Sequence, residues 1–146
     1  MSDHTLTPLI LDTSVLTAIA RADLDVIALI QGYDSRKQPL VIPALAVVGA
    51  WLDTRAEEAS ELLAGLELLD NATVAPLNGT DQATRLAYVV ARTGLDPWDA
   101  HTAAIADAAI CPILTLNAET WQEHVADLDE RLHIVQIADP GEGREN

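Results

Sequence analysis

The chain of 146 residues has the length of one domain with a single apolar core. Its apolar share of 49% excludes a disordered chain, and its formal net charge of −15 excludes a surface that attracts nucleic acid as a whole. No apolar run is long enough to span a bilayer, so we expect no membrane association, and the single cysteine excludes an intrachain disulfide.

The start of the chain lacks a basic region followed by an apolar stretch and a small-residue cleavage site. We therefore expect a cytoplasmic protein, which agrees with the use of only one cysteine. We expect residues 1–138 to form a single domain. The polar stretch DPGEGREN, residues 139–146, is expected to be a disordered tail.

Short apolar runs alternate with helical patterns along the first half of the chain. In chain order we expect the strand PLILD (8–12), the helix SVLTAIAR beginning at Ser14, the helix LDVIALIQGY capped by Asp23, the strand PLVIP (39–43), and the helical segments ALAVVGAWL and RAEEASELLAGLELL.

The second half of the chain continues this alternation. In chain order we expect the strand ATVAPL, the helix DQATRLAYVVAR opened by Thr80 and closed by Gly94, a helix capped by Asp96 with Pro97 at its first position, the strand CPILTL, the helix AETWQEHVADL and the strand HIVQI. Apolar strands that alternate with helices are typical of a parallel sheet covered on both faces, so the predicted fold class is α/β.

Asp12 and Asp99 are the acidic residues best placed for chemistry. Asp12 ends the first predicted strand beside Thr13 and Ser14, at the sheet edge where α/β proteins bind ligands, and a carboxylate there can hold a hard cation. Asp99 lies in the first turn of the helix after Asp96. Each also has a structural explanation, because Asp12 can cap a helix and Asp99 suits the helix dipole.

Asn117 follows the fourth predicted strand and lies at the same edge of the sheet. Its position is compatible with a turn residue, a binding group, or the remains of a catalytic acid. The turn after Asp12 has no glycine, which excludes a phosphate-binding loop, and the four histidines show no metal-ligand spacing. We expect Cys111 to be a packed apolar residue.

Four stretches in this order, LILDTSVL, VIPALAVVGAW, GLDPWDAHTAAIA and PILTLNAETW, resemble the PIN domain, the nuclease domain of many toxins of bacterial type II toxin–antitoxin pairs. The resemblance covers about residues 8–137. It implies a three-layer α/β/α sandwich with a small parallel sheet. It also implies cleavage of RNA with Mg²⁺ or Mn²⁺, which about four acidic residues hold.

The match to these acids is incomplete. Asp12 and Asp99 match two of them, whereas Gly49 stands where the family usually has Glu and Asn117 where it has Asp. The resemblance therefore assigns catalysis and metal binding to Asp12 and Asp99. The residues that could support them are Thr13, Asp96, Thr115 and Asn117.

Gly49 lies in the middle of a predicted helix, where glycine costs about 1 kcal/mol relative to alanine. A neighbouring backbone that packs closely there would explain the glycine. Three acids could compensate for the missing ones: Asp53, one helical turn later, Glu119, two residues after Asn117, and Asp96. Trp98 lies next to the expected site, where it could stack on a base.

The partial match leads to two hypotheses. The first is an RNA endonuclease with a reduced metal site, since Mg²⁺ often binds through one or two carboxylates, water and substrate phosphate. The second is a catalytically inactive PIN-fold module. It would bind an antitoxin-like partner or form a homodimer, as members of the family often do. If Asp12 and Asp99 lay far apart, the chain would instead be an unrelated α/β protein.

Overall fold

The computed structural model describes residues 6–124 and 133–137. The tail expected at 139–146 lies outside them, as does the end of the helix predicted over AETWQEHVADL. The described elements, in chain order, are β1 (Leu9–Leu11), α1 (Thr13–Ala20), α2 (Leu24–Ser35), β2 (Leu40–Pro43), α3 (Ala44–Thr54), α4 (Glu57–Ala64), the 3-10 helix η1 (Gly65–Leu68), β3 (Ala72–Ala75), α5 (Gly79–Thr93), α6 (Pro97–Ala109), β4 (Ile113–Thr115), α7 (Ala118–His124) and β5 (Ile134–Gln136).

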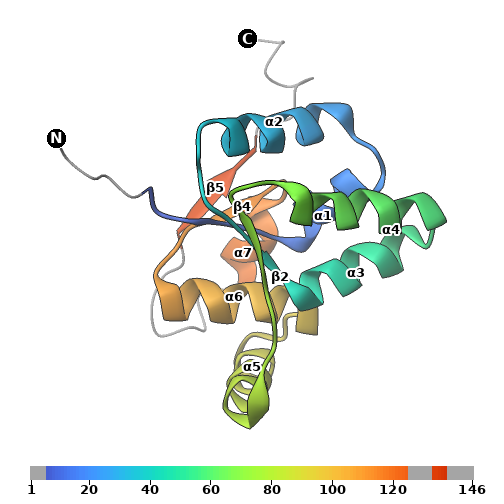
Figure 1. The fold of residues 1–146 in the computed structure, drawn as a ribbon. Helices are drawn as coiled ribbons and strands as arrows, with labels where there is room; N and C mark the ends of the chain where they lie inside the picture. The colour runs from blue at the N-terminus through green and yellow to red at the C-terminus, as the bar shows by residue number, and fades with distance from the viewer. Residues whose placement is uncertain (1–5, 125–132, 138–146) are drawn as a thin grey trace, which may run out of the picture.

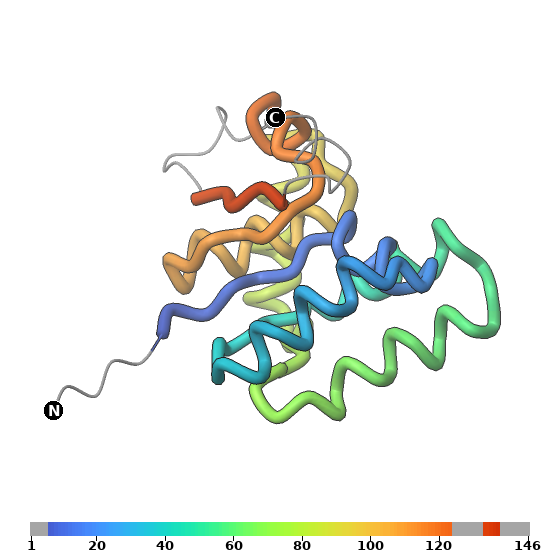
Figure 2. Tube along the Cα trace, turned by 90° about the horizontal axis from the view of Figure 1, so that it is seen from above, coloured from blue at the N-terminus to red at the C-terminus, as the bar shows by residue number. Residues whose placement is uncertain are grey.

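The described strands form one parallel sheet in the order β3-β2-β1-β4-β5. Figure 2 shows β1 in blue, β4 in orange and β5 in red side by side. In the register of the central pair, Leu11 lies beside Leu114, so both strands end at the same edge. The first residues after these strands are therefore brought together, as expected for the carboxyl edge of a parallel sheet.

Helices cover both faces of the sheet, which confirms the predicted three-layer α/β/α sandwich. Leu9 and Leu11 of β1 join a core with α1, α2, α3 and α4, whereas Ile10 points to the other side, toward α5, α6 and α7. This alternation is the two-residue period of a strand. Figure 1 shows the two outer layers, with α2 above the sheet and α5 and α6 below it.

The helix ends agree in part with the predicted ones. Asp23 caps α2 by accepting from two backbone N–H groups, and Gly94 ends α5 with a positive φ of 74°. Ser14, however, does not begin α1: the helix starts at Thr13, and Asp12 is its N-cap. Thr80 does not open α5, because the helix already starts one residue earlier at Gly79.

The segment RAEEASELLAGLELL is not one continuous helix. The α-helical part ends at Ala64, and a 3-10 turn leads from Gly65 toward β3. Cys111 is buried and burial raises the pKa of its thiol, which agrees with a packed and unreactive residue. Among the described residues, no helix combines the length and the apolar character needed to cross a bilayer.

Candidate functional site

A pocket of about 580 Å³ opens at the carboxyl edge of β1 and β4. The N-terminal parts of α1 and α6 contribute to its walls, together with α3 and the start of α7. All four positions that the resemblance singles out line it: Asp12, Gly49, Asp99 and Asn117. The fold thus gathers these residues at one place, as the order of the sequence motifs predicts.

The carboxylate of Asp12 is buried and hydrogen-bonded by the protein itself. Asp12 is only 3% exposed. Oδ1 accepts from the Ser14 hydroxyl at 2.6 Å and from the Val15 N–H at 3.1 Å, and Oδ2 accepts from the Trp121 indole N–H at 2.8 Å. Three donors therefore hold Asp12, which caps α1 and links that helix to α7.

A chain of hydrogen bonds connects this carboxylate to the end of β4. Ser14 donates to Asp12 and accepts from the Leu116 N–H at 2.9 Å, so its single proton is already used. In the 3.3 Å contact between Ser14 and Thr115, the Thr115 hydroxyl is then the donor. Thr115 in turn accepts from the Asn117 N–H at 2.9 Å. Thr115 is fully buried and does not line the pocket, so its role is to join the two turns.

Gly49 leaves no room for a side chain, because the indole of Trp98 lies directly over it. A Cβ atom on Gly49 would be 2.5 Å from Cγ of Trp98 and 2.8 Å from two further ring atoms, which is far inside van der Waals contact. The close neighbour is thus a side chain and not a backbone, contrary to the expectation from sequence. Trp98 occupies the space in which any side chain at position 49 would begin.

Asn117 is exposed, and its amide nitrogen donates to the hydroxyl of Thr120 at 2.7 Å. It lies directly before α7, so it is a turn residue that also faces the pocket. Thr13 lines the same pocket. Its Oγ1 is buried and has no hydrogen-bond partner, which makes it an unsatisfied polar atom beside Asp12.

Three further acids line the pocket: Asp53, Asp96 and Asp99. Asp96 occupies the N-cap position of α6 and Pro97 follows it, as predicted, but the Asp96 side chain makes no capping hydrogen bond. Asp99 is half-buried in the first turn of α6. Asp53 pairs with Arg21 at 2.6 Å, and both side chains are more than half exposed, so this ion pair contributes little stability.

His101 lies on α6 but takes no part in the pocket. It is buried, and its Nδ1 accepts from the Leu45 N–H at 3.3 Å at the start of α3. Desolvation lowers the pKa of this imidazole below its ordinary value of 6.5. A neutral ring is also what the hydrogen bond requires, because a protonated Nδ1 cannot accept.

The residues present do not fit the two-metal site that the resemblance implies. Two-metal hydrolysis needs several carboxylates around two ions. Of the four positions, Gly49 supplies no ligand and is covered by Trp98, and Asn117 is neutral, so only Asp12 and Asp99 supply carboxylates. Asp12 in addition already accepts from three protein donors. Over residues 6–124 and 133–137, no three His, Cys, Asp or Glu side chains are grouped so that they could hold a metal ion.

The fold is PIN-like, and it matches several solved structures. A chain from the VapBC2 structure of Rickettsia felis, bound to a DNA fragment from its promoter, matches with a TM-score of 0.61 and 11% identity over 90% of this chain and 99% of that one. A chain from the DNA-bound VapBC structure of Salmonella typhimurium gives 0.60 and 16%, over 90% and 98%. PAE2754 from Pyrobaculum aerophilum gives 0.54 and 22%, over 88% and 84%.

Searches with protein-family models and against curated proteins find no match to this chain. The similarity to solved structures therefore lies in the fold. This confirms the PIN-like fold predicted from the motifs, and it explains why sequence identity alone would not reveal it.

Three residues that shape the site were not assigned their roles from sequence. Ser14 and Trp121 hold Asp12, and Trp98 covers Gly49. For Trp98 a signal was present: glycine is unfavourable in a helix, which indicated a close neighbour at Gly49, and this tryptophan adjoins the predicted site. Nothing local in the sequence indicates the bond between Trp121 and Asp12, because the two residues are 109 positions apart.

Proposed function

We propose that this chain is a PIN-fold binding protein whose catalytic metal site is no longer complete. One observation carries the proposal: the Trp98 indole fills the space over Gly49 where the third acid would begin. A lost acid alone could be compensated by a neighbour. A large ring over position 49 goes beyond the loss of an acid, since the ring in its present position leaves no room for a side chain there.

The carboxylate of Asp12 supports the same proposal. Its three donors come from α1 and α7 and are part of a network that reaches Leu116 and Asn117. In this setting Asp12 serves the folded structure. A buried carboxylate with good hydrogen bonds contributes to stability, whereas removal of one partner leaves an unsatisfied group.

We propose a protein of the antitoxin type, or a second copy of this chain, as the partner. Two of the similar structures are VapBC complexes, in which a PIN-domain toxin is found with its antitoxin. The apolar surface of α3 and α4 supports a contact of this kind. Val48, Trp51 and Leu52 are exposed by 46%, 38% and 39%, and they line a largely apolar pocket of about 520 Å³.

A reduced-site ribonuclease using Mg²⁺ or Mn²⁺ is the second candidate. It is favoured by one observation: Asp12, Asp96, Asp99 and Asn117 all line the same pocket. This candidate requires Asp12 to bind a metal in addition to its three protein donors.

Cleavage of a fluorogenic RNA in Mn²⁺ separates the two candidates. Wild type, Asp12→Asn, Asp99→Asn and the exposed control Asp70→Asn are purified in parallel. We expect the same residual rate from all four, because that rate would come from contaminating nuclease. A rate that falls in both pocket variants and not in Asp70→Asn would establish the ribonuclease and refute our proposal.

The oligomeric state tests the partner surface. Light scattering after gel filtration is measured for wild type, Val48→Glu and the exposed control Thr73→Glu on β3. If a homodimer uses the surface of α3 and α4, Val48→Glu gives monomers and the control does not. If wild type is monomeric, this surface does not form a homodimer, and the proposed partner is then a different protein.

A further inference from the structure

A second groove lies between α2 and the carboxyl ends of β4 and β5. It has a volume of about 940 Å³ and shares only Asn117 with the site pocket. Leu116 follows β4, Val135 lies on β5 and Ile137 follows it, while Leu29 and Tyr33 line the groove from α2. Val135 is 39% exposed, so an apolar surface is open to solvent here.

The groove is held in shape by hydrogen bonds. The side chain of Gln136 accepts from the Ala118 N–H at 2.7 Å and donates to the carbonyl oxygen of Leu116 at 2.9 Å. These bonds tie β5 to the turn between β4 and α7. The surface is therefore formed before any partner binds, which lowers the entropic cost of association.

Three acidic side chains also line this groove. Asp23 and Asp25 line it from the start of α2 and Glu119 from α7, and no Lys, Arg or His is among the described residues that line it. These acids do not form a group that could hold a metal ion. Spread carboxylates beside an apolar surface complement a ligand with separated positive charges.

We propose that this groove binds a segment of another protein that presents a bulky apolar side chain flanked by arginine or lysine. The apolar side chain enters between Leu29 and Val135, and the basic side chains lie near Asp25 and Glu119. The volume is within the range of sites that bury such groups.

Charge also argues against the other occupants. At this groove, a second copy of this chain would bring a net charge of −15 to an acidic surface. The α3 and α4 surface proposed above for a homodimer is mostly apolar and shares none of these acids. The chain's own residues 138–146 contain three acids and one arginine, so their net charge is negative, like that of the groove. The inference goes beyond the proposed function, because it concerns a different surface and does not depend on the state of the metal site.

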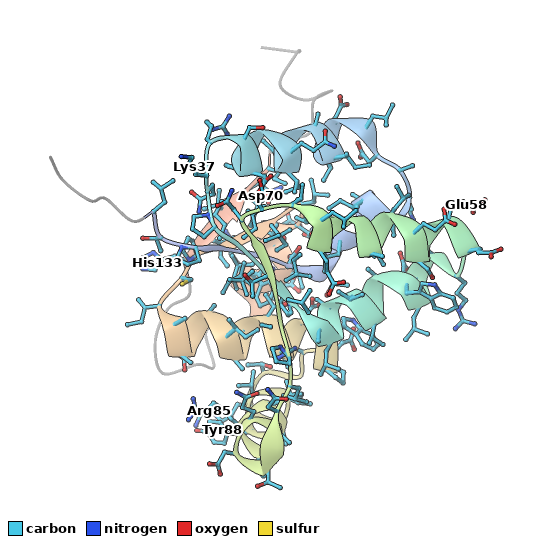
Figure 3. All side chains as sticks on the ribbon, viewed as in Figure 1. Lys37, Glu58, Asp70, Arg85, Tyr88 and His133 are labelled. Atoms are coloured by element: carbon cyan, nitrogen blue, oxygen red, sulfur yellow. The ribbon has the colours of Figure 1, made fainter. Side chains whose placement is uncertain are left out.

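Fluorescence anisotropy tests the groove with a labelled nine-residue peptide of alternating arginine and leucine. Two double variants are compared: Asp25→Lys/Glu119→Lys in the groove, and Glu58→Lys/Asp70→Lys outside it. All four positions are exposed, and both variants change the net charge equally. Figure 3 shows Glu58 on α4 and Asp70 before β3.

We expect the groove variant to bind the peptide about tenfold more weakly than wild type and the control variant to bind within about twofold. A peptide with alanine in place of leucine should also bind more weakly to wild type. Equal losses in the two double variants would mean attraction to the acidic surface as a whole and would overturn the proposal.

Two further results would also overturn it. One is the absence of binding to wild type at millimolar peptide. The other is binding that appears only after residues 138–146 are deleted, because the chain itself would then be the occupant. Neither result bears on metal binding or RNA cleavage, so the groove and the proposed function are tested independently.

Discussion

Gly49→Ala tests the close contact with Trp98 by adding a single methyl group. The new Cβ would lie 2.5 Å from Cγ of the indole, whereas ordinary contact begins at 3.4 Å, so the ring must retreat by about 0.9 Å. Forcing extra volume into a packed site costs typically about 1–3 kcal/mol. In an open helix the same change would stabilise by about 1 kcal/mol, because alanine is the better helix former.

Urea unfolding measures this effect in two backgrounds. We expect the change in free energy of unfolding on Gly49→Ala to be about 1–3 kcal/mol more unfavourable in wild type than in Trp98→Ala, where the space is free. Gly32→Ala in α2 is the control, because its Cβ would meet only Arg36 at an ordinary 3.6 Å. It should stabilise by up to about 1 kcal/mol. If Gly49→Ala has the same effect in both backgrounds, Trp98 does not cover Gly49 and our explanation of the missing acid fails.

Three further predictions concern stability. Asp12→Asn should lower the free energy of unfolding, measured in urea, by about 1–3 kcal/mol, because the new amide nitrogen must face one of the three donors. Trp121→Phe should cause a loss of similar size, because it removes the indole N–H that donates to Asp12. No loss in either variant would contradict the hydrogen bonds described for Asp12. Thr13→Val should leave the free energy of unfolding unchanged or raise it by up to about 1 kcal/mol, since it removes a buried hydroxyl without a hydrogen-bond partner. A large loss of stability would show that this hydroxyl does form a hydrogen bond. The pKa of His101 is lowered, so just below pH 6.5 the folded state binds fewer protons than the unfolded state. The free energy of unfolding should therefore fall as the pH drops from 7.5 to 5.5, by up to about 1.4 kcal/mol per pH unit. His101→Gln should remove this pH dependence, and a pH dependence that the variant retains would assign it to other groups.

The sequence was sufficient to predict the layers of the fold and the edge at which the site lies. Apolar strands alternating with helices predicted the parallel sheet, and local chemistry identified the helix ends at Asp23, Gly94 and Pro97. These features depend on neighbours within a few positions. Ser14 was wrongly placed at the start of α1 because Asp12 and Ser14 are both good capping residues, and here the hydroxyl of Ser14 is used by Asp12 and Leu116.

The chemistry of the pocket was less predictable, because it depends on contacts between distant segments. The sequence identified Gly49 and Asn117 as missing acids, but the meaning of a missing acid depends on what occupies its place. At Gly49 that occupant is Trp98, which lies 49 positions later in the sequence. At position 117 the side chain is the amide of an asparagine in a turn, hydrogen-bonded to Thr120. Side-chain packing of this kind is set by the assembled fold.

Calorimetric titration with Mn²⁺ is the most direct test of an incomplete metal site. The proteins to compare are wild type and a triple variant in which Gly49→Glu and Asn117→Asp restore the acids and Trp98→Ala makes room for them. We expect no saturable binding by wild type up to millimolar Mn²⁺ and measurable binding by the triple variant. Saturable binding by wild type that is lost in Asp99→Asn would contradict the account, because it would mean that the acids still present are enough to hold the metal.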